Sequence, residues 1–414
     1  YNKRLESIHY VTFLKDGRFI WTSEKDGWRR LYLYDKNGKL LHPLTPKYNV
    51  VTNLVDVDQS KGWVYYSARS AHGNPYNNEF YRVSLKGGQP QQLAEAPEMS
   101  TGAPEKNVKM SPDKQFFWVI HGRINEHPVM EIHASNGKLI DSIPIVSNFL
   151  NAYKHSAPES FHALAADGKT DLYGVIFKPD NFNPAHKYPV IEEIYAGPGE
   201  INSIRSVLTP IYWLLQGLAN RGYIVVADDG RGTPGRSKAF KDAFYGEIGQ
   251  HEIADHAAVL RGISKSRLYM DMKRVGVFGH SWGGYFALRA MLQRPGLYKV
   301  GVVSSGDADL KDFRVPIEPF MGCTPSECPK AYERGSNTKI MGRLKGKLLI
   351  MHGTADEDVP FGESVKMIEA LKKAGKIYDY TVFPGSNHVT YQDPYWFERM
   401  IYFFKKNLKD LTNK

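Results

Sequence analysis

Short runs of aromatic and β-branched residues, separated by polar turns, fill the first 150 residues of the chain. Glycine-containing turns at 35–40, 85–89 and 135–139 lie about fifty residues apart, and two apolar runs precede each of them. The runs occupy residues 19–22 and 31–34, 63–66 and 80–83, and 116–120 and 130–132. Such runs are typical of strands, and a repeat of about forty to fifty residues with about four short strands is typical of a propeller blade. The pattern predicts about three blades of a β-propeller over residues 1–150, with unrelated hairpins in a sandwich as the alternative.

From about residue 160 the pattern changes to buried apolar runs that alternate with helical stretches. The apolar runs lie at 190–195, 223–227, 274–278, 300–303 and 348–351, and the helical stretches at 253–264, 285–293, 362–374 and 398–408. Strands that alternate with helices predict a mostly parallel sheet covered on both faces. We therefore predict an α/β domain over residues 151–414, with the boundary in the polar stretch 148–160.

The composition is that of a folded protein, with 42% hydrophobic and 24% charged residues. The 54 basic residues are interleaved with 44 acidic ones, so the net charge of +10 is spread along the chain. Nucleic-acid-binding proteins usually concentrate Lys and Arg in one patch, and we therefore expect no nucleic-acid partner. Because no run of eighteen apolar residues occurs, we also expect no membrane-spanning helix.

The first residues of the chain and its two cysteines provide further information about its organisation. A propeller closes with about four to eight blades, so we expect the remaining blades upstream of Tyr1 or in a partner chain. No charged and then apolar leader follows Tyr1, so we expect an excerpted or processed chain without its targeting segment. Cys323 and Cys328 are too few and too close for a disulfide scaffold or a four-ligand zinc site, and they either form one small bridge or stay free.

The segment Gly279-His280-Ser281-Trp282-Gly283 matches the G-x-S-x-G pattern and lies between a predicted strand and a predicted helix. In that context small residues on both sides of a serine allow a sharp strand-to-helix turn, which exposes the hydroxyl at the carboxyl edge of the sheet. A serine hydroxyl is a weak nucleophile at neutral pH and needs a base and an orienting carboxylate. The pattern predicts a nucleophile at Ser281.

Candidates for the acid and the base follow Ser281 in the chain. Asp356, Glu357 and Asp358 follow one predicted strand, and His388 follows a later one. The order serine, acid, histidine is that of α/β hydrolases. We prefer Asp356 as the acid, and Glu357 and Asp358 stay open alternatives.

For several other motifs we predict a structural role and no catalytic or ligand-binding role. We assign structural roles to His280 and His352. His251 and His256 are five residues apart and so do not share one helix face, and we expect no metal there. The glycine-rich segment 230–236 lacks the Gly-Lys-Ser/Thr ending of a phosphate loop, so we expect no nucleotide cofactor.

Together these motifs make the chain resemble the C-terminal part of a prolyl oligopeptidase family serine peptidase, in its dipeptidyl-peptidase branch of the bacterial type. The α/β part carries motifs of the family in the family's order, at 188–189, 195–198, 229–232, 279–285, 321–322 and 352–356. The segment 23–32 is similar to a blade sequence common in bacterial members. The resemblance implies an α/β-hydrolase catalytic domain with a mostly parallel, doubly wound sheet, preceded by the last blades of a truncated β-propeller.

The resemblance also implies roles for single residues. Ser281 would attack the peptide carbonyl, His388 would move the proton, and Asp356 would hold the imidazole. The Tyr195 hydroxyl matches the family's oxyanion-hole tyrosine and would act with the backbone N–H of Trp282. A packed tyrosine at a strand end is the alternative for Tyr195.

The substrate pocket departs from the family pattern. We expect it to be lined by Trp282, Leu310, Phe313, Ile317, Asp358 and Val359. Leu310 stands where the family has Trp, Phe313 replaces a Tyr, and Pro316 or Ile317 replaces another. Asp358 replaces an Asn that binds the adjoining substrate carbonyl. The resemblance therefore implies a looser apolar pocket, in which Ala or another residue at the cleaved position is an alternative to Pro.

We expect a serine peptidase that acts on short peptides through an acyl-enzyme, with no metal and no cofactor, and that releases N-terminal dipeptides. In the family, a glutamate pair on an upstream blade binds the free amine, and we assign the adjacent Glu192 and Glu193 a structural role instead. An acylaminoacyl peptidase or oligopeptidase, an esterase or thioesterase, and a propeller interaction module with an inactive hydrolase stay open.

The resemblance further implies a homodimer, for which the aromatic segment 396–404 is a candidate surface, with core packing as the alternative. A periplasmic or secreted location fits the resemblance and a cysteine bridge, and a cytoplasmic location is the alternative.

Overall fold

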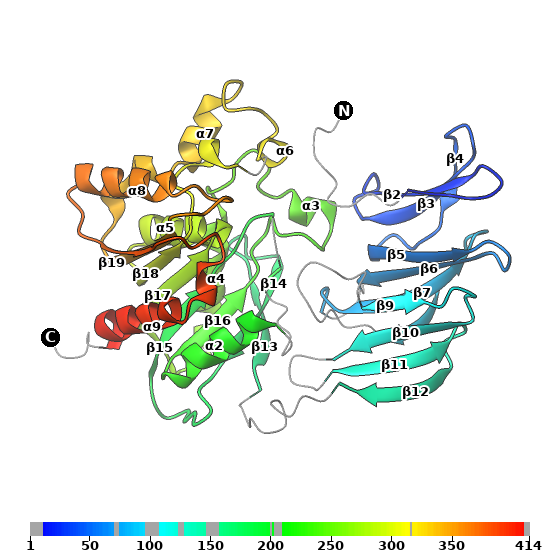
Figure 1. Cartoon of the computed structure of the whole chain (residues 1–414), viewed down its shortest axis with the longest axis horizontal. Coiled ribbons are helices and arrows are strands. Elements are labelled where there is room, and N and C mark those ends of the chain that lie inside the picture. The colour runs from blue at the N-terminus through cyan, green and yellow to red at the C-terminus, as the bar shows by residue number, and fades with distance from the viewer. Residues whose placement is uncertain are drawn as a thin grey trace.

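The computed structural model describes residues 11–69, 74–95, 107–122, 128–145, 157–198, 201–202, 209–314 and 317–409. Figure 1 shows a stack of small sheets from the first part of the chain beside an α/β structure from the second part. The predicted boundary at residue 150 falls outside the described residues, so the division into 1–150 and 151–414 stays a prediction.

The first part forms three antiparallel sheets of four strands each, paired in sequence order. The first sheet contains β1 (Val11–Phe13), β2 (Phe19–Ser23), β3 (Arg30–Tyr34) and β4 (Leu40–Pro43). The second contains β5 (Val50–Asp58), β6 (Trp63–Arg69), β7 (Asn78–Ser84) and β8 (Gln91–Glu95). The third contains β9 (Val108–Met110), β10 (Phe116–His121), β11 (Val129–Ala134) and β12 (Leu139–Pro144). The predicted three blades are confirmed.

The blades stack face to face because both faces of the middle sheet are apolar. Along β6 the side chains alternate: Val64 and Tyr66 join the core shared with the first sheet, and Tyr65 joins the core shared with the third. The rings of Phe80 and Phe117 meet across the second interface with centroids 4.8 Å apart. This packing distinguishes the stack from separate hairpins in a sandwich.

The second part is built on one eight-stranded sheet in the order β13-β14-β16-β15-β17-β18-β19-β20. Its strands are β13 (Glu159–Leu164), β14 (Asp171–Phe177), β15 (Tyr188–Glu193), β16 (Ile224–Asp228), β17 (Met270–His280), β18 (Tyr298–Ser304), β19 (Lys347–Gly353) and β20 (Asp379–Phe383). The pairs from β16 to β20 are parallel, and β13 and β14 add an antiparallel edge. The predicted mostly parallel sheet is confirmed.

Helices cover both faces of this sheet, as predicted. They are α2 (Pro210–Asn220), α3 (Lys238–Lys241), α4 (Glu252–Ser264), α5 (Trp282–Gln293), α6 (Glu318–Met321), α7 (Pro329–Gly335), α8 (Gly362–Lys373) and α9 (Pro394–Phe404). Alternate residues of β15 enter two different cores: Val190 packs with α4 and α5, whereas Ile191 packs with α2 and α9. Within the described residues, no helix is both long and apolar enough to cross a membrane.

The first blade contacts the α/β part directly. The backbone N–H of Lys238 donates to the Gly27 carbonyl at 2.8 Å. Lys241, on the same short helix α3, forms an ion pair with the nearly buried Glu24. These contacts attach the turn between β2 and β3 to the loop that follows β16.

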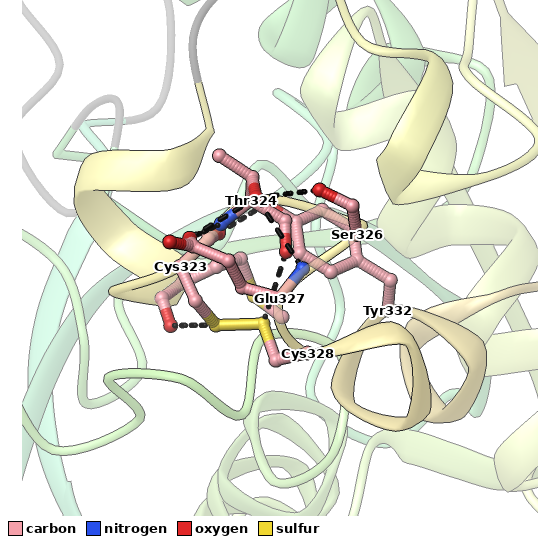
Figure 2. The surroundings of a disulfide bond; sticks show 7 residues. Cys323, Thr324, Ser326, Glu327, Cys328 and Tyr332 are labelled. Atoms are coloured by element: carbon pink, nitrogen blue, oxygen red, sulfur yellow. Dashed lines mark hydrogen bonds between the residues drawn. A yellow bond between two sulfur atoms is a disulfide. The ribbon is translucent and has the colours of Figure 1, made fainter.

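Cys323 and Cys328 form a disulfide, which closes the short loop between α6 and α7 (Figure 2). Within the loop, the Glu327 carboxylate accepts hydrogen bonds from the Thr324 backbone N–H at 2.8 Å and from its hydroxyl at 3.0 Å. The hydroxyl of Tyr332 on α7 donates to the Cys323 carbonyl at 2.9 Å. Of the two states left open by the sequence, the structure has the bridged one.

Candidate active site

The candidate nucleophile lies on a sharp turn between β17 and α5. Ser281 has φ 60° and ψ −123°, a backbone conformation that residues with side chains rarely adopt. Its N–H donates to the Ser304 carbonyl on the neighbouring strand at 2.9 Å. An added Cβ would stand 2.1 Å from a backbone oxygen at Gly279 and 2.3 Å from one at Gly283. The turn therefore requires glycine at both positions, as a nucleophile elbow does.

A histidine and a carboxylate meet at the ends of two adjacent parallel strands. Asp356 follows β19 and His388 follows β20. The His388 Nδ1 lies 2.9 Å from one Asp356 carboxylate oxygen and 3.0 Å from the other. Because Nδ1–H donates to the carboxylate, Nε2 is the nitrogen left to accept a proton. Glu357 and Asp358, the alternative acids, have exposed side chains.

Asp356 is held from several sides. The backbone N–H groups of Val359 and Asp358 donate to its Oδ1 at 2.8 and 3.1 Å. The fully buried His352 places Nε2 3.2 Å from its Oδ2. Burial acts to raise the pKa of Asp356, but the contacts with His352, His388 and the Val359 amide outweigh it and hold that pKa well below its ordinary value. The carboxylate is therefore ionised at neutral pH.

His280 packs directly against His388, with ring centroids 4.7 Å apart. Burial, followed by the charge of His388, lowers the pKa of His280 to about 3, so this ring is neutral. The Ser304 hydroxyl accepts from Trp396 Nε1 at 2.8 Å, which leaves its own proton to donate to His280 Nδ1 at 2.9 Å. Among the residues that the structure describes, no hydrogen bond joins Ser281 itself to His388. In unliganded enzymes such bonds are often long and tighten only with substrate.

The two candidate oxyanion donors flank the elbow. Tyr195 follows β15, and an added Cβ at Gly283 would come within 3.2 Å of its Cα. Trp282 is the first residue of α5, where backbone N–H groups have no partner within the helix. The indole of Trp282 lies so close to Gly197 that a Cβ there would stand 2.4 Å from Nε1.

The residues predicted for the substrate pocket fall into two groups. Phe313 is partly exposed and packs edge-on against Trp282 with centroids 4.7 Å apart, and Asp358 is exposed. Leu310, Ile317 and Val359 are 0%, 3% and 4% exposed. Leu310 packs tightly against Gly335 and has no exposed surface in this structure, so its place in the substrate pocket stays a prediction. Pro316, the alternative to Ile317, lies outside the described residues.

Sequence reasoning missed the second layer of this site. The contacts of His280 with Ser304 and His388 carry no local sequence signal, because they depend on the order of the strands. The contact of His352 with Asp356 joins residues only four positions apart, but no sequence motif marked it. A separate group, Glu192, Asp228 and His256, is the one among the described residues whose side chains could hold a metal ion. The sequence analysis gave Glu192 a structural role, expected no metal at His256 and made no prediction for Asp228.

Comparisons with known proteins agree with this arrangement. Residues 210–411 match the sequence model described as "Prolyl oligopeptidase family", and residues 3–126 match "Dipeptidyl peptidase IV (DPP IV) N-terminal region". The chain is 32% identical to dipeptidyl peptidase 8 of Mus musculus over 240 residues, which are 56% of this chain and 26% of that protein. It is 27% identical to a probable dipeptidyl-aminopeptidase B of Coccidioides posadasii over 405 residues, which are 93% of this chain and 42% of that protein.

Two solved structures share the fold over 96% of the chain. Dipeptidyl peptidase 4 of Porphyromonas gingivalis has a TM-score of 0.83 at 28% identity, with 56% of that chain covered. A putative dipeptidyl aminopeptidase IV from Bacteroides ovatus has a TM-score of 0.85 at 24% identity, with 58% of that chain covered. The chain thus spans less than half of each of these curated relatives and a little over half of these solved chains. One matched region falls on the stacked sheets and the other on the α/β part, and the chain belongs to the prolyl oligopeptidase family.

Proposed function

We propose that this chain is part of a serine peptidase that releases N-terminal dipeptides from short peptides through an acyl-enzyme. The observation that carries the proposal is the hydrogen-bonded His388–Asp356 pair next to the strained turn that presents Ser281. The names of the relatives, all dipeptidyl peptidases or dipeptidyl-aminopeptidases, support the dipeptidyl form of the activity. An esterase or an inactive interaction module has no comparable support.

The geometry supports a two-step reaction. The Ser281 Oγ attacks the peptide carbonyl carbon while its proton passes to His388 Nε2, and the protonated imidazole is stabilised by the Asp356 carboxylate. His388 then gives that proton to the leaving amine as the peptide C–N bond breaks, which leaves the acyl group on Ser281. Water repeats the sequence: His388 takes a proton from it, the hydroxide attacks the ester, and Ser281 leaves with the proton.

The negative charge on the carbonyl oxygen needs donors in place before the reaction. We assign this role to the Trp282 backbone N–H and the Tyr195 hydroxyl, which flank the elbow. One such donor contributes about 3 to 4 kcal/mol to transition-state stabilisation. Tyr195→Phe should therefore lower kcat about 100- to 1,000-fold and leave the fold intact.

The pocket favours a small apolar residue at the cleaved bond. Trp282 and Phe313 form an aromatic wall. Leu310, which stands where the family has Trp, is buried and adds no side chain to that wall. Asp358 presents a carboxylate, which accepts hydrogen bonds and repels a substrate carbonyl. We propose cleavage after Pro or Ala, with a weaker preference for Pro than an all-aromatic pocket would give.

A substrate panel with the full-length protein tests the activity. Chromogenic free-amine Xaa-Pro and Xaa-Ala dipeptides, longer free-amine peptides, their N-acetylated forms and a butyrate ester are compared, with Ser281→Ala as the control. We expect cleavage of the free-amine dipeptides alone. Faster cleavage of the blocked peptides would replace the proposal with an acylaminoacyl peptidase or oligopeptidase, and cleavage of the ester alone would replace it with an esterase.

We also propose that the protein forms a homodimer and that it is located in the periplasm or secreted. On α9, Trp396 and Phe403 are buried in the core, whereas Tyr395 and Tyr402 are 58% and 59% exposed. The exposed pair supports a contact surface, and Tyr402→Asp should then shift the mass measured by light scattering from dimer to monomer. The disulfide supports an oxidising compartment such as the periplasm, which cell fractionation tests.

A further inference from the structure

Four polar side chains meet in the core of the α/β part, away from solvent. Glu192 lies on β15, Asp228 ends β16, His256 lies on α4, and Tyr298 begins β18; all four are fully buried. Residues two positions apart in a strand point to the same face of the sheet. Glu192 therefore shares a face with Val190, and Asp228 shares that face with Val226, and this face is covered by α4 and α5. Two carboxylates are thus placed among apolar residues, where an unpaired charge is costly.

The three groups with metal-ligating atoms are close together. The His256 Nδ1 lies 3.2 Å from Glu192 Oε1 and 3.1 Å from Asp228 Oδ2. One ligand atom of each residue lies within 4.8 Å of the others. The Tyr298 hydroxyl donates to the second oxygen of Glu192 at 2.5 Å, which orients that carboxylate.

Hydrogen bonds do not satisfy this cluster. The His256 Nδ1 carries at most one proton, and it hydrogen-bonds to Glu192. Neither oxygen of the fully buried Asp228 makes a hydrogen bond of good geometry within the described residues, and its one close polar contact is the His256 Nδ1, 3.1 Å from Oδ2. A buried carboxylate without a hydrogen bond that points at an imidazole and a second carboxylate calls for a cation.

We propose that Glu192, Asp228 and His256 bind a divalent cation of the zinc type. Two carboxylates and a neutral imidazole balance a charge of +2, so the occupied site is neutral as a whole. Zinc bonds to nitrogen and oxygen are about 2.0 to 2.2 Å long, which places tetrahedral ligand atoms about 3.3 Å apart, close to the two measured distances. Imidazole nitrogen as a ligand favours zinc over magnesium or calcium.

The occupied site would have a structural role. Zinc takes four ligands, so these three residues leave one position for a further ligand, but their complete burial keeps that position away from bulk solvent and from any substrate. The cation would join α4 to two central strands. Next to His256, Asp255 already holds the loop after β16 through Arg231, at 2.9 Å from both Nε and Nη2. This proposal does not depend on the proposed peptidase activity.

Protons compete with a metal ion for the ligand atoms of His256 and Asp228. Burial alone would lower the pKa of His256, but Asp228 and Glu192 raise it well above its ordinary value. Burial raises the pKa of Asp228 to about 7. A zinc ion must therefore displace the Nδ1 proton, as structural zinc does when it binds during folding.

Metal analysis of the full-length protein tests the proposal. The protein is produced in medium with zinc, purified without a metal column, dialysed against a chelator, and analysed for metal by mass spectrometry. We expect about one zinc per chain. The matched variants are His256→Gln, which loses a ligand, and His251→Gln, which changes an exposed histidine five residues earlier. His251→Gln should keep the metal, and His256→Gln should lose it together with several degrees of Tm.

The metal content tests the proposal without any measurement of peptidase activity. Should His256→Gln fail to fold, wild-type protein produced with cobalt should show the visible absorption of tetrahedral Co²⁺, and Glu192→Gln supplies a second ligand variant. A folded wild-type protein that contains neither metal under these conditions would overturn the proposal and leave a proton-sharing cluster. Wild-type zinc content in His256→Gln would also overturn it.

Discussion

Replacing His352 with phenylalanine tests whether the orientation of Asp356 limits catalysis. The imidazole is fully buried, and its Nε2 lies 2.9 Å from the Val359 carbonyl and 3.2 Å from the Asp356 carboxylate. Phenylalanine keeps a flat ring, somewhat larger than imidazole, but donates no hydrogen bond. Asp356 then keeps its backbone donors and His388 and loses one positioning contact.

The size of the effect follows from that contact. The single Nε2 proton is shared with the Val359 carbonyl, so the contact contributes at most about 1.5 to 3 kcal/mol, the value for a hydrogen bond to a charged group, and about 1.4 kcal/mol corresponds to a tenfold change in rate. The Asp356 carboxylate matters most when His388 becomes positively charged in the transition state. We therefore expect His352→Phe to lower kcat about 10- to 150-fold, with a change in KM below about twofold.

The measurement is kcat and KM on the best dipeptide substrate, with circular dichroism and a thermal melt to show that the variant is folded. Ser364→Ala is the matched control, because it removes the 2.7 Å contact at the other nitrogen of His352 and leaves both Nε2 contacts in place. His352→Gln should recover part of the rate, since its amide N–H can reach the carboxylate. A folded His352→Phe enzyme with kcat within about twofold of wild type would refute the reasoning, as would an equal loss in Ser364→Ala.

Three further predictions concern the elbow, a buried acid and the disulfide. Gly283→Ala places a methyl group 2.3 Å from a backbone oxygen, so it should abolish activity and lower the unfolding free energy by about 1 to 3 kcal/mol. The control Gly296→Ala, whose added methyl group has nothing within 4 Å, should change neither quantity. Equal effects of the two variants in denaturant melts would contradict this prediction. Burial, followed by nearby carboxylates, raises the pKa of Asp307 from 3.8 to about 8, so the folded state favours the protonated form and this carboxyl costs stability increasingly as pH rises from about 4 to 8. Asp307→Asn should therefore raise Tm more at pH 8 than at pH 5, and a larger gain at pH 5 would reverse the assignment. Replacing Cys323 and Cys328 with serine should lower the unfolding free energy by about 2 kcal/mol for so short a loop. A reductant should lower the wild-type Tm but not that of the double variant, and a reductant-insensitive wild type would argue against the bridge.

Features that depend on short spacings along the chain could be predicted from the amino-acid sequence alone. Alternation with a period of two and turns about fifty residues apart define the blades, because a strand and its hairpin partner are close in the chain. The elbow is equally local, since the turn at Ser281 needs small residues two positions away on each side, and both glycines are visible in the sequence. The alternation of strands and helices was enough to predict a mostly parallel sheet with helices on both faces.

Which distant side chains meet depends on how the strands are ordered in the folded protein. Of three adjacent acids, Asp356 is the one that contacts His388, because β19 and β20 are neighbours and their ends point the same way. Leu310, predicted to line a looser apolar pocket, is fully buried, because Gly335 of α7 packs against it. The group of Glu192, Asp228 and His256 spans more than sixty positions and exists only because strand register places two carboxylates under one helix. Sequence spacing is silent about such contacts, because the order of strands in the sheet differs from their order in the chain.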